Sequence, residues 1–197
     1  MDTARFVVAV LTWVGFPPAV IYWFIIHPFA DRWRRIGVVP TMVIVSVIFV
    51  AIGVVFYLIH DMVLVTEFGT HWSLWVVALI SYVTSVGIEL QCRKHLKFRM
   101  LAGIPELEAD QSERKLLNEG IYSRVRHPRY VSVTFGVLAM ALFSNYLAVW
   151  VMIPTLLLAL YIVAVLEERE LVQSLGDRYR EYQRQVPMFI PRLGRNP

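Results

Sequence analysis

Residues 128–166 read PRYVSVTFGVLAMALFSNYLAVWVMIPTLLLALYIVAVL, two apolar segments separated by the polar sequence Ser144-Asn145-Tyr146. A helix rises about 1.5 Å per residue, so about 20 residues cross a hydrocarbon core of roughly 30 Å. The second segment, Leu147–Leu166, has that length. The first, Val131–Phe143, reaches a usable length if its helix begins near Pro128, because proline suits a first helical turn. The two segments therefore predict a helical hairpin in a membrane.

The rest of the chain is also strongly apolar. Hydrophobic residues make up 57% of the 197 residues and charged residues only 17%, against about 25% charged in an ordinary soluble domain. Three further blocks, Phe6–Ile26, Val38–Ile59 and Trp72–Leu90, are long enough to cross a bilayer or nearly so. We therefore expect an all-α integral membrane protein with about five transmembrane helices, of which the last two form the hairpin.

We expect a single domain over residues 1–197. Residues 1–90 contain the three N-terminal spans, and residues 91–197 contain a cytoplasmic loop, the hairpin and a tail. Beyond the membrane the tail predicts a C-terminal helix, weakened at Gly176, with one apolar face. That face consists of Leu171, Leu175, Tyr179 and Tyr182.

Lysine and arginine are distributed unevenly among the loops. Asp31–Ile36 contains three arginines, Gln91–Arg129 contains nine basic residues and the chain after Leu166 contains six arginines. If five spans alternate, 18 of the 19 basic residues lie on one side. The positive-inside rule places that side in the cytoplasm and the N-terminus outside. A four-span alternative, with a re-entrant final hairpin, keeps the same cytoplasmic side.

Polar residues gather where the hairpin begins and ends. The sequence GIYSRVRHPRY (residues 120–130) precedes its first helix, and EERE (residues 167–170) follows its second. Because a hairpin brings its two ends together, we expect His127-Pro128 beside Glu167. A helix N-terminus favours an anion, whereas a carboxylate favours an ammonium group, so the pair suits a zwitterionic amino-acid group. Position alone favours a simpler role for the arginines, which is to bind anionic lipid headgroups.

Other kinds of site find little support. The five histidines lack metal-ligand spacing, and the single Cys92 excludes an internal disulfide. The chain has no glycine-rich phosphate loop. Glu89 and Arg93, one turn apart, predict an ion pair. Because the basic residues adjoin the membrane segments, we expect membrane lipids as partners and no nucleic acid.

The motifs at the hairpin resemble those of one known family. LLNEGIY (residues 116–122) followed by RHPRY (residues 126–130) is similar to the signature of integral membrane methyltransferases. That family includes isoprenylcysteine carboxyl methyltransferase and the phospholipid N-methyltransferases. Downstream, Glu167-Glu168, LGDRYREY (residues 175–182) and Val186-Pro187 resemble the tail of the same group. The resemblance covers roughly residues 111–192.

The resemblance implies S-adenosylmethionine as cofactor, with S-adenosylhomocysteine as product, in a cytoplasmic pocket of the hairpin. It also implies a lipophilic acceptor, such as an isoprenylcysteine-like carboxylate or a lipid amine. Glu167 is expected to meet the ammonium group of the cofactor. No catalytic base and no metal ligand is assigned. The residues expected to bind the cofactor are Lys115, Leu116, Leu117, Tyr122, Arg126, His127, Pro128, Arg129, Tyr130 and Glu167.

Two positions depart from the family pattern. Ser132 stands where many members have glycine, and Val163 stands one turn before Glu167, where prenylcysteine enzymes carry an arginine. The second departure argues against a prenylcysteine acceptor. Two other interpretations remain. NADPH-dependent membrane sterol reductases have a motif similar to Arg-His-Pro-x-Tyr, and a non-enzymatic scaffold would use the arginines to bind lipid. The Glu-Glu and Val-Pro motifs favour methyl transfer.

Overall fold

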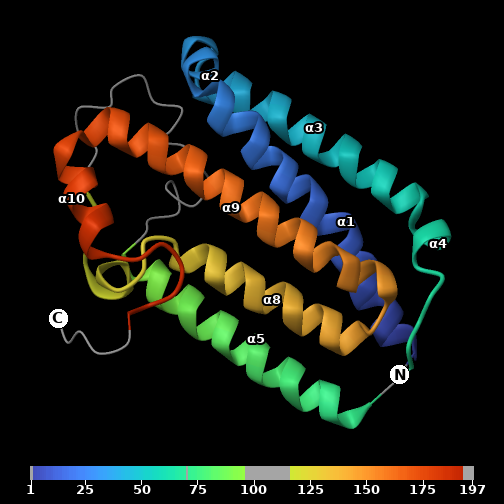
Figure 1. Ribbon diagram of the computed structural model, residues 1–197. Helices are drawn as coiled ribbons and strands as arrows, with labels where there is room; N and C mark the ends of the chain where they lie inside the picture. Colours follow the sequence, from blue (N-terminus) through green and yellow to red (C-terminus); the bar gives the residue numbers. More distant parts are fainter. Residues whose placement is uncertain (1, 70, 96–115, 193–197) are drawn as a thin grey trace.

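The computed structural model describes residues 2–69, 71–95 and 116–192 (Figure 1). Within these ranges the chain is helical, with no β-strand beyond one isolated bridge between Glu67 and Tyr146. The long helices are α1 (Asp2–Ile26), α3 (Val38–Leu58), α5 (Trp72–Arg93), α8 (Pro128–Ser144) and α9 (Leu147–Leu175). The short elements are η1 (His27–Phe29), α2 (Ala30–Ile36), α4 (His60–Val63), η2 (Gly120–Ser123) and α10 (Asp177–Gln185).

The long helices confirm the predicted fold class. Helices α1, α3, α5 and α9 are each long and apolar enough to cross a membrane, and α8 is a shorter apolar helix of 17 residues. As predicted, α8 begins at Pro128. These helices fit an integral, multi-pass membrane protein, in which the side facing the cytoplasm remains a prediction. We call the end near α2 and α10 the inner end and the end near the α8–α9 turn the outer end.

The turn between α8 and α9 depends on Asn145. This residue adopts a left-handed conformation (φ 55°, ψ 43°), which asparagine tolerates better than most side chains. Its backbone N–H donates to Ala141 O at 2.8 Å, and its side-chain amide donates to Gly69 O at 3.0 Å. Trp150 in turn donates from its indole to Asn145 Oδ1 at 2.9 Å. The turn thus reverses the chain between Ser144 and Leu147 and confirms the predicted hairpin.

Small residues bring α5 and α8 into close contact. Ser132 Oγ donates to Ser85 O at 2.9 Å, and Ser85 Oγ donates to Ser132 O at 2.8 Å. A Cβ atom at Gly136 would lie 3.2 Å from Ser85 Oγ. Membrane helices commonly pack through small and hydroxyl-bearing residues of this kind. Ser132, at a position where the resembled motif often has glycine, therefore gains a hydrogen-bonded partner on α5.

The helices form a layered bundle in which α1 has a central place. Helix α3 packs on α1, α1 contacts both α8 and α9, and α8 packs on α5 (Figure 1). Trp13 on α1 donates from its indole to Phe56 O on α3 at 3.2 Å. Helices α1 and α3 therefore form one unit, which packs through α1 against the hairpin.

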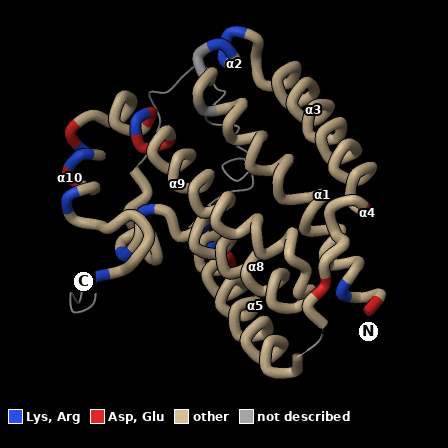
Figure 2. The backbone as a smooth tube through the Cα atoms, turned by 45° about the vertical axis from the view of Figure 1, so that its right-hand side comes forward, with Lys and Arg blue, Asp and Glu red and all other residues tan. Residues whose placement is uncertain are grey.

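The charged residues lie mainly at the two ends of the helices (Figure 2). At the outer end Arg5, whose side chain is 1% exposed, forms an ion pair with Glu67. Its guanidinium also donates to Ser144 O at 2.8 and 3.1 Å and to Gly69 O at 2.8 Å. One buried cation thus ties α1 to the hairpin turn and to the segment before α5.

Candidate functional site

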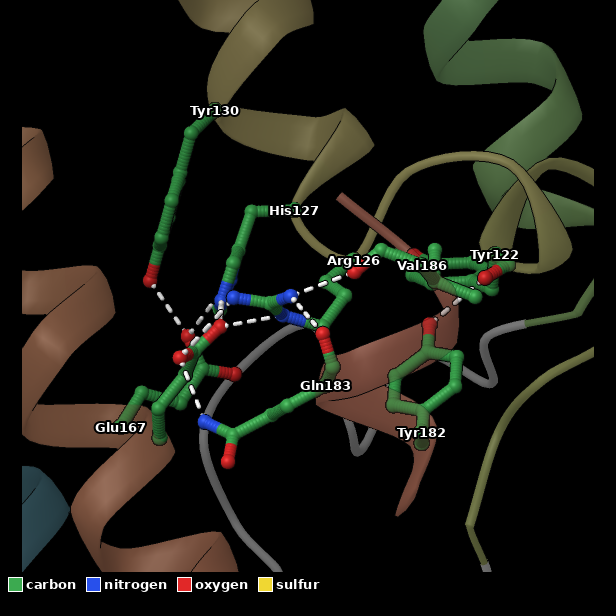
Figure 3. Close-up of polar contacts among 9 residues, drawn as sticks. Tyr122, Arg126, His127, Tyr130, Glu167, Tyr182, Gln183 and Val186 are labelled. Atoms are coloured by element: carbon green, nitrogen blue, oxygen red, sulfur yellow. Dashed lines mark hydrogen bonds and ion pairs between the residues drawn. The ribbon is translucent and has the colours of Figure 1, made fainter. Parts of the chain in front are cut away.

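The inner end of α9 carries three glutamates that each contact a different part of the protein, and Figure 3 shows the contact between Glu167 and Tyr130. Glu167 accepts a hydrogen bond from Tyr130 of α8 at 2.8 Å. Glu168 accepts from Arg126, just before α8, at 2.6 and 3.2 Å. Glu170 forms an ion pair with Arg34 of α2. Because successive residues of a helix point about 100° apart, one turn of α9 can bind several neighbouring elements.

His127 lies between the first two of these glutamates, where the hairpin geometry predicted it. Its Nε2 is 2.9 Å from Glu168 Oε1, and its Nδ1 is 3.5 Å from Glu167 Oε2. Burial alone would lower the pKa of His127, but hydrogen bonds and charge from Glu167 and Glu168 outweigh it and raise the pKa to about 9. The side chain is therefore an imidazolium at neutral pH, with a carboxylate at each ring nitrogen.

Two aromatic neighbours contact the ring of His127. The Tyr130 ring lies parallel to it, with centroids 5.4 Å apart and planes within 2°. The Phe189 ring packs against it with centroids 5.9 Å apart. Because His127 is only 6% exposed, these contacts and the two carboxylates fix its orientation.

Arg126 forms a second buried ion pair with Glu168 at this end. Besides Glu168, its guanidinium donates to the backbone carbonyls of Gln183, at 3.0 Å, and Val186. Gln183 donates from its side-chain amide to Glu168 Oε2 at 2.7 Å. The side chains of Arg126 and Glu168 are each 11% exposed. Arg126 therefore holds α9, α10 and the chain after α10 together.

The C-terminal strap, residues 186–189, runs beside this cluster. The backbone N–H of Arg126 donates to Pro187 O at 2.9 Å, and that of His127 donates to Met188 O at 3.0 Å. Because Phe189 also contacts the His127 ring, the strap forms one wall of the cluster. Tail and hairpin entry thus make one structural unit.

Helix α10 packs against the segment that precedes α8. Its buried Tyr179 and Tyr182 form an apolar cluster with Val186, and the partly buried Leu116 packs against that cluster. Tyr182 Oη donates to Tyr122 O at 2.6 Å. Burial is the main cause that raises the pKa of the Tyr122 hydroxyl, so this group stays protonated at physiological pH. Leu171 and Leu175 of α9 complete the cluster, as the apolar face of the tail predicted.

An open groove lies beside the charged cluster, between α9 and α10. Its volume is about 410 Å³, within the range of about 300–1,000 Å³ usual for small-molecule sites. One wall combines carboxylate, guanidinium and amide groups with two valines. The lining residues are Val165, Glu168, Arg169, Val172, Gln173 and Gln183.

The structure brings about half of the expected cofactor-binding residues into one cluster. That group consists of Arg126, His127, Pro128, Tyr130 and Glu167. Two more lie nearby: Leu116 packs against α10, and the carbonyl of Tyr122 accepts a hydrogen bond from Tyr182 of α10. Leu117, which precedes η2, and Arg129, in the first turn of α8, are both partly buried. Lys115 lies outside the described residues.

Two residues of the cluster were not among those expected. Glu168 is the most enclosed of the three glutamates, at 8% exposure, and Gln183 reaches it from α10. The sequence contained a signal for Glu168, since it adjoins Glu167 on the same helix. For Gln183 the sequence contained no such signal, because its contact with Glu168 depends on how α10 folds back.

Two other expectations concern residues outside this cluster. The expected ion pair of Glu89 and Arg93 is confirmed, at 3.0 Å. The described residues contain no group of three or more potential metal ligands.

The fold and the charged cluster define a multi-pass membrane protein with a polar site at one end of a helical hairpin. The family model for phospholipid methyltransferases matches residues 75–178, from α5 to the start of α10. The chain therefore belongs to the phospholipid methyltransferase family. All of the expected cofactor-binding residues lie within the matched region, whereas α1 and α3 lie outside it.

Several curated relatives can be compared with this chain. A methanethiol S-methyltransferase from Pseudomonas deceptionensis is 34% identical over 147 residues, which are 68% of this chain and 47% of the relative. A protein of the same name from Crocosphaera subtropica is 33% identical over 89 residues, 45% of this chain and 34% of the relative. The cobalt-zinc-cadmium resistance protein CzcN of Cupriavidus metallidurans is 32% identical over 78 residues, 40% of this chain and 36% of the relative.

The chain thus spans about half the length, or less, of the curated relatives it matches. No solved structure matches it significantly.

Proposed function

We propose that this protein is an S-adenosylmethionine-dependent methyltransferase whose cofactor binds at the inner end of the hairpin. The observation that carries the proposal is the position of Glu167. This carboxylate lies beside the N-terminus of α8, held by Tyr130 at 2.8 Å and near His127 at 3.5 Å. Membership of a methyltransferase family supports methyl transfer as the reaction at that site.

The charges around Glu167 suit the amino-acid part of the cofactor. Glu167, with its side chain 29% exposed, is accessible enough to accept an ammonium group, whereas Glu168 is occupied by Arg126, His127 and Gln183. In the described chain, no side chain caps the first turn of α8. The positive end of its dipole favours a carboxylate. Both ionic groups of an amino acid thus find complementary partners.

When bound, S-adenosylmethionine would supply a methyl group attached to a positively charged sulfur. The residues of this chain would bind and orient the reactants. Tyr130 fixes the Glu167 carboxylate by its hydrogen bond, and the His127 ring stacks on Tyr130. Holding two reactants in line contributes several kcal/mol to lowering a barrier, on the order of 7–11 kcal/mol in favourable cases.

For the acceptor, we propose a small apolar thiol. The relatives named methanethiol S-methyltransferase support a thiol. Val163 supports it too, because a prenylcysteine carboxylate would need a cation where this side chain is apolar and 1% exposed. The isoprenylcysteine-like carboxylate and the lipid amine are the other lipophilic acceptors to be tested.

Calorimetry on the purified protein in detergent tests the proposed cofactor. S-adenosylhomocysteine and NADPH are titrated in separate experiments. Binding of S-adenosylhomocysteine alone is the expected result. Binding of NADPH alone would indicate a reductase, and binding of neither ligand would leave a lipid-binding scaffold as the better account.

A further inference from the structure

Helices α1, α8 and α9 meet in an apolar cluster that begins at Tyr130. The cluster therefore starts at the residue that holds Glu167 and extends from there toward the outer end. Its fully buried members are Val137, Leu156 and Leu160, and the partly buried residues packed against them are Phe16, Val20, Tyr130, Val133 and Ile153.

The burial of this cluster changes along the helices. Like Tyr130, the cluster residues Phe16 and Val20 of α1 and Val133 of α8 are only partly buried. Further toward the outer end, Val137 and Ala141 of α8 have no exposed surface. On α8, apolar surface is therefore partly accessible toward the proposed methyl-transfer site and closed toward the outer end, whereas on α9 the inner residue Leu160 is buried and Ile153 is partly buried.

The outer end is closed by polar contacts as well. Arg5 binds Ser144 O and Gly69 O and pairs with Glu67. A second contact, the ion pair of Arg34 and Glu170, joins α2 to α9 at the inner end. Helix α1 is thus held against the hairpin near both of its ends, which fixes Phe16 and Val20 relative to Tyr130.

From this arrangement we infer that Phe16 and Val20 of α1 determine which acceptors the enzyme accepts. The inference rests on the proposed methyl transfer and adds the residues that select the acceptor. Phe16 and Val20 are one helical turn apart and share a face of α1, which lies outside the region matched by the family model. In this account the family region holds the cofactor, and α1 limits the length of the acceptor's alkyl chain.

The test compares acceptors of graded length. Methanethiol, butanethiol and octanethiol are offered with S-adenosylmethionine to the full-length protein in nanodiscs, and kcat/KM is measured for each. The variants are Phe16→Ala and Val20→Ala, which enlarge the space, and Val20→Phe, which reduces it. Leu11→Ala is the matched control, because Leu11 lies on the same helix and is 67% exposed.

In Phe16→Ala and Val20→Ala, the ratio of kcat/KM for octanethiol to kcat/KM for methanethiol should rise by roughly tenfold or more. Their KM for S-adenosylmethionine should stay within about twofold of wild type. Val20→Phe should lower the ratio, and Leu11→Ala should leave it unchanged. Binding of S-adenosylhomocysteine shows which variants are folded.

If folded variants methylate thiols with the wild-type ratio, the inference is wrong while the proposed function stands. If the wild-type protein binds S-adenosylhomocysteine but methylates none of the thiols, the proposed acceptor fails and the inference fails with it.

Discussion

Glu168 accepts two hydrogen bonds from Arg126, at 2.6 and 3.2 Å, in a pair whose two side chains are each 11% exposed. The pair connects the end of α9 to the segment that leads into α8. Removing one partner of a buried pair leaves an uncompensated charge, which typically costs about 3–5 kcal/mol. These contacts indicate a positioning role for Glu168, which joins α9 to the segment before α8.

Glu168→Gln should lower the thermal midpoint of the detergent-solubilised protein, because it leaves Arg126 and His127 buried without their shared carboxylate. Circular dichroism at the helical band measures this directly. Glu181→Gln is the matched control, since Glu181 pairs with Arg184 on the exposed face of α10 and exposed pairs contribute little. Equal midpoints for the two variants would contradict the positioning role.

Because of His127, the thermal midpoint of the protein should fall as the pH becomes alkaline. Its pKa is raised from 6.5 to about 9, so the imidazolium stabilises the folded state fully below about pH 6.5. This contribution is lost as pH rises through about 9, and it amounts to roughly 3 kcal/mol. Thermal midpoints measured between pH 6.5 and 9.5 should therefore fall more steeply for wild type than for His127→Asn. Parallel slopes would show that the imidazolium contributes nothing.

Gly120→Ala should destabilise the hairpin entry. Gly120 has φ +58°, and a Cβ atom there would lie 2.2 Å from His95 Nε2. Backbone strain alone costs about 1–2 kcal/mol in this conformation, and the contact requires the ring to move. Gly15→Ala is the control of opposite sign, because Gly15 lies within α1 with nothing near its Cβ position and alanine favours a helix. A lower midpoint for Gly120→Ala and an unchanged or higher one for Gly15→Ala are expected.

Much of the fold followed from local sequence. The apolar lengths predicted the long helices, Pro128 marked the start of α8, and Ser144-Asn145-Tyr146 marked the turn. The packing partners did not follow, because length and hydropathy do not say which helices touch. Contact between α5 and α8 depends on Ser85 and Ser132, which are far apart in sequence and bond each other's carbonyls.

The site was predicted in part for a similar reason. Antiparallel helices had to bring His127 beside Glu167, so that contact was predictable from the hairpin. The C-terminal strap was not, because Arg126 and His127 bind the backbone carbonyls of Pro187 and Met188, and any residue except proline has the same N–H group. Which of two adjacent glutamates is buried depends on the rotation of α9, which its apolar sequence does not determine closely.

Arg5→Met should destabilise the outer end, since Glu67 and the carbonyls of Ser144 and Gly69 lose their common donor. The loss should be about 1–3 kcal/mol, because buried acceptors lose their donor while the Glu67 side chain is 34% exposed. Adding Glu67→Leu should restore part of the thermal midpoint, because no unpaired carboxylate then remains. If the double variant is less stable than Arg5→Met, the unpaired Glu67 carboxylate is not a cause of the lost stability.

The proposed methyl transfer is tested most directly by transfer of a labelled methyl group from S-adenosylmethionine to methanethiol, with wild type and Glu167→Gln compared. We expect transfer by the wild type. In Glu167→Gln we expect KM for the cofactor to rise about tenfold or more, because a charged hydrogen bond of about 1.5–3 kcal/mol is lost. The variant's thermal midpoint should fall less than that of Glu168→Gln, because His127 and Arg126 keep their contacts with Glu168. No transfer by the wild type, or wild-type cofactor KM in the variant, would contradict the account.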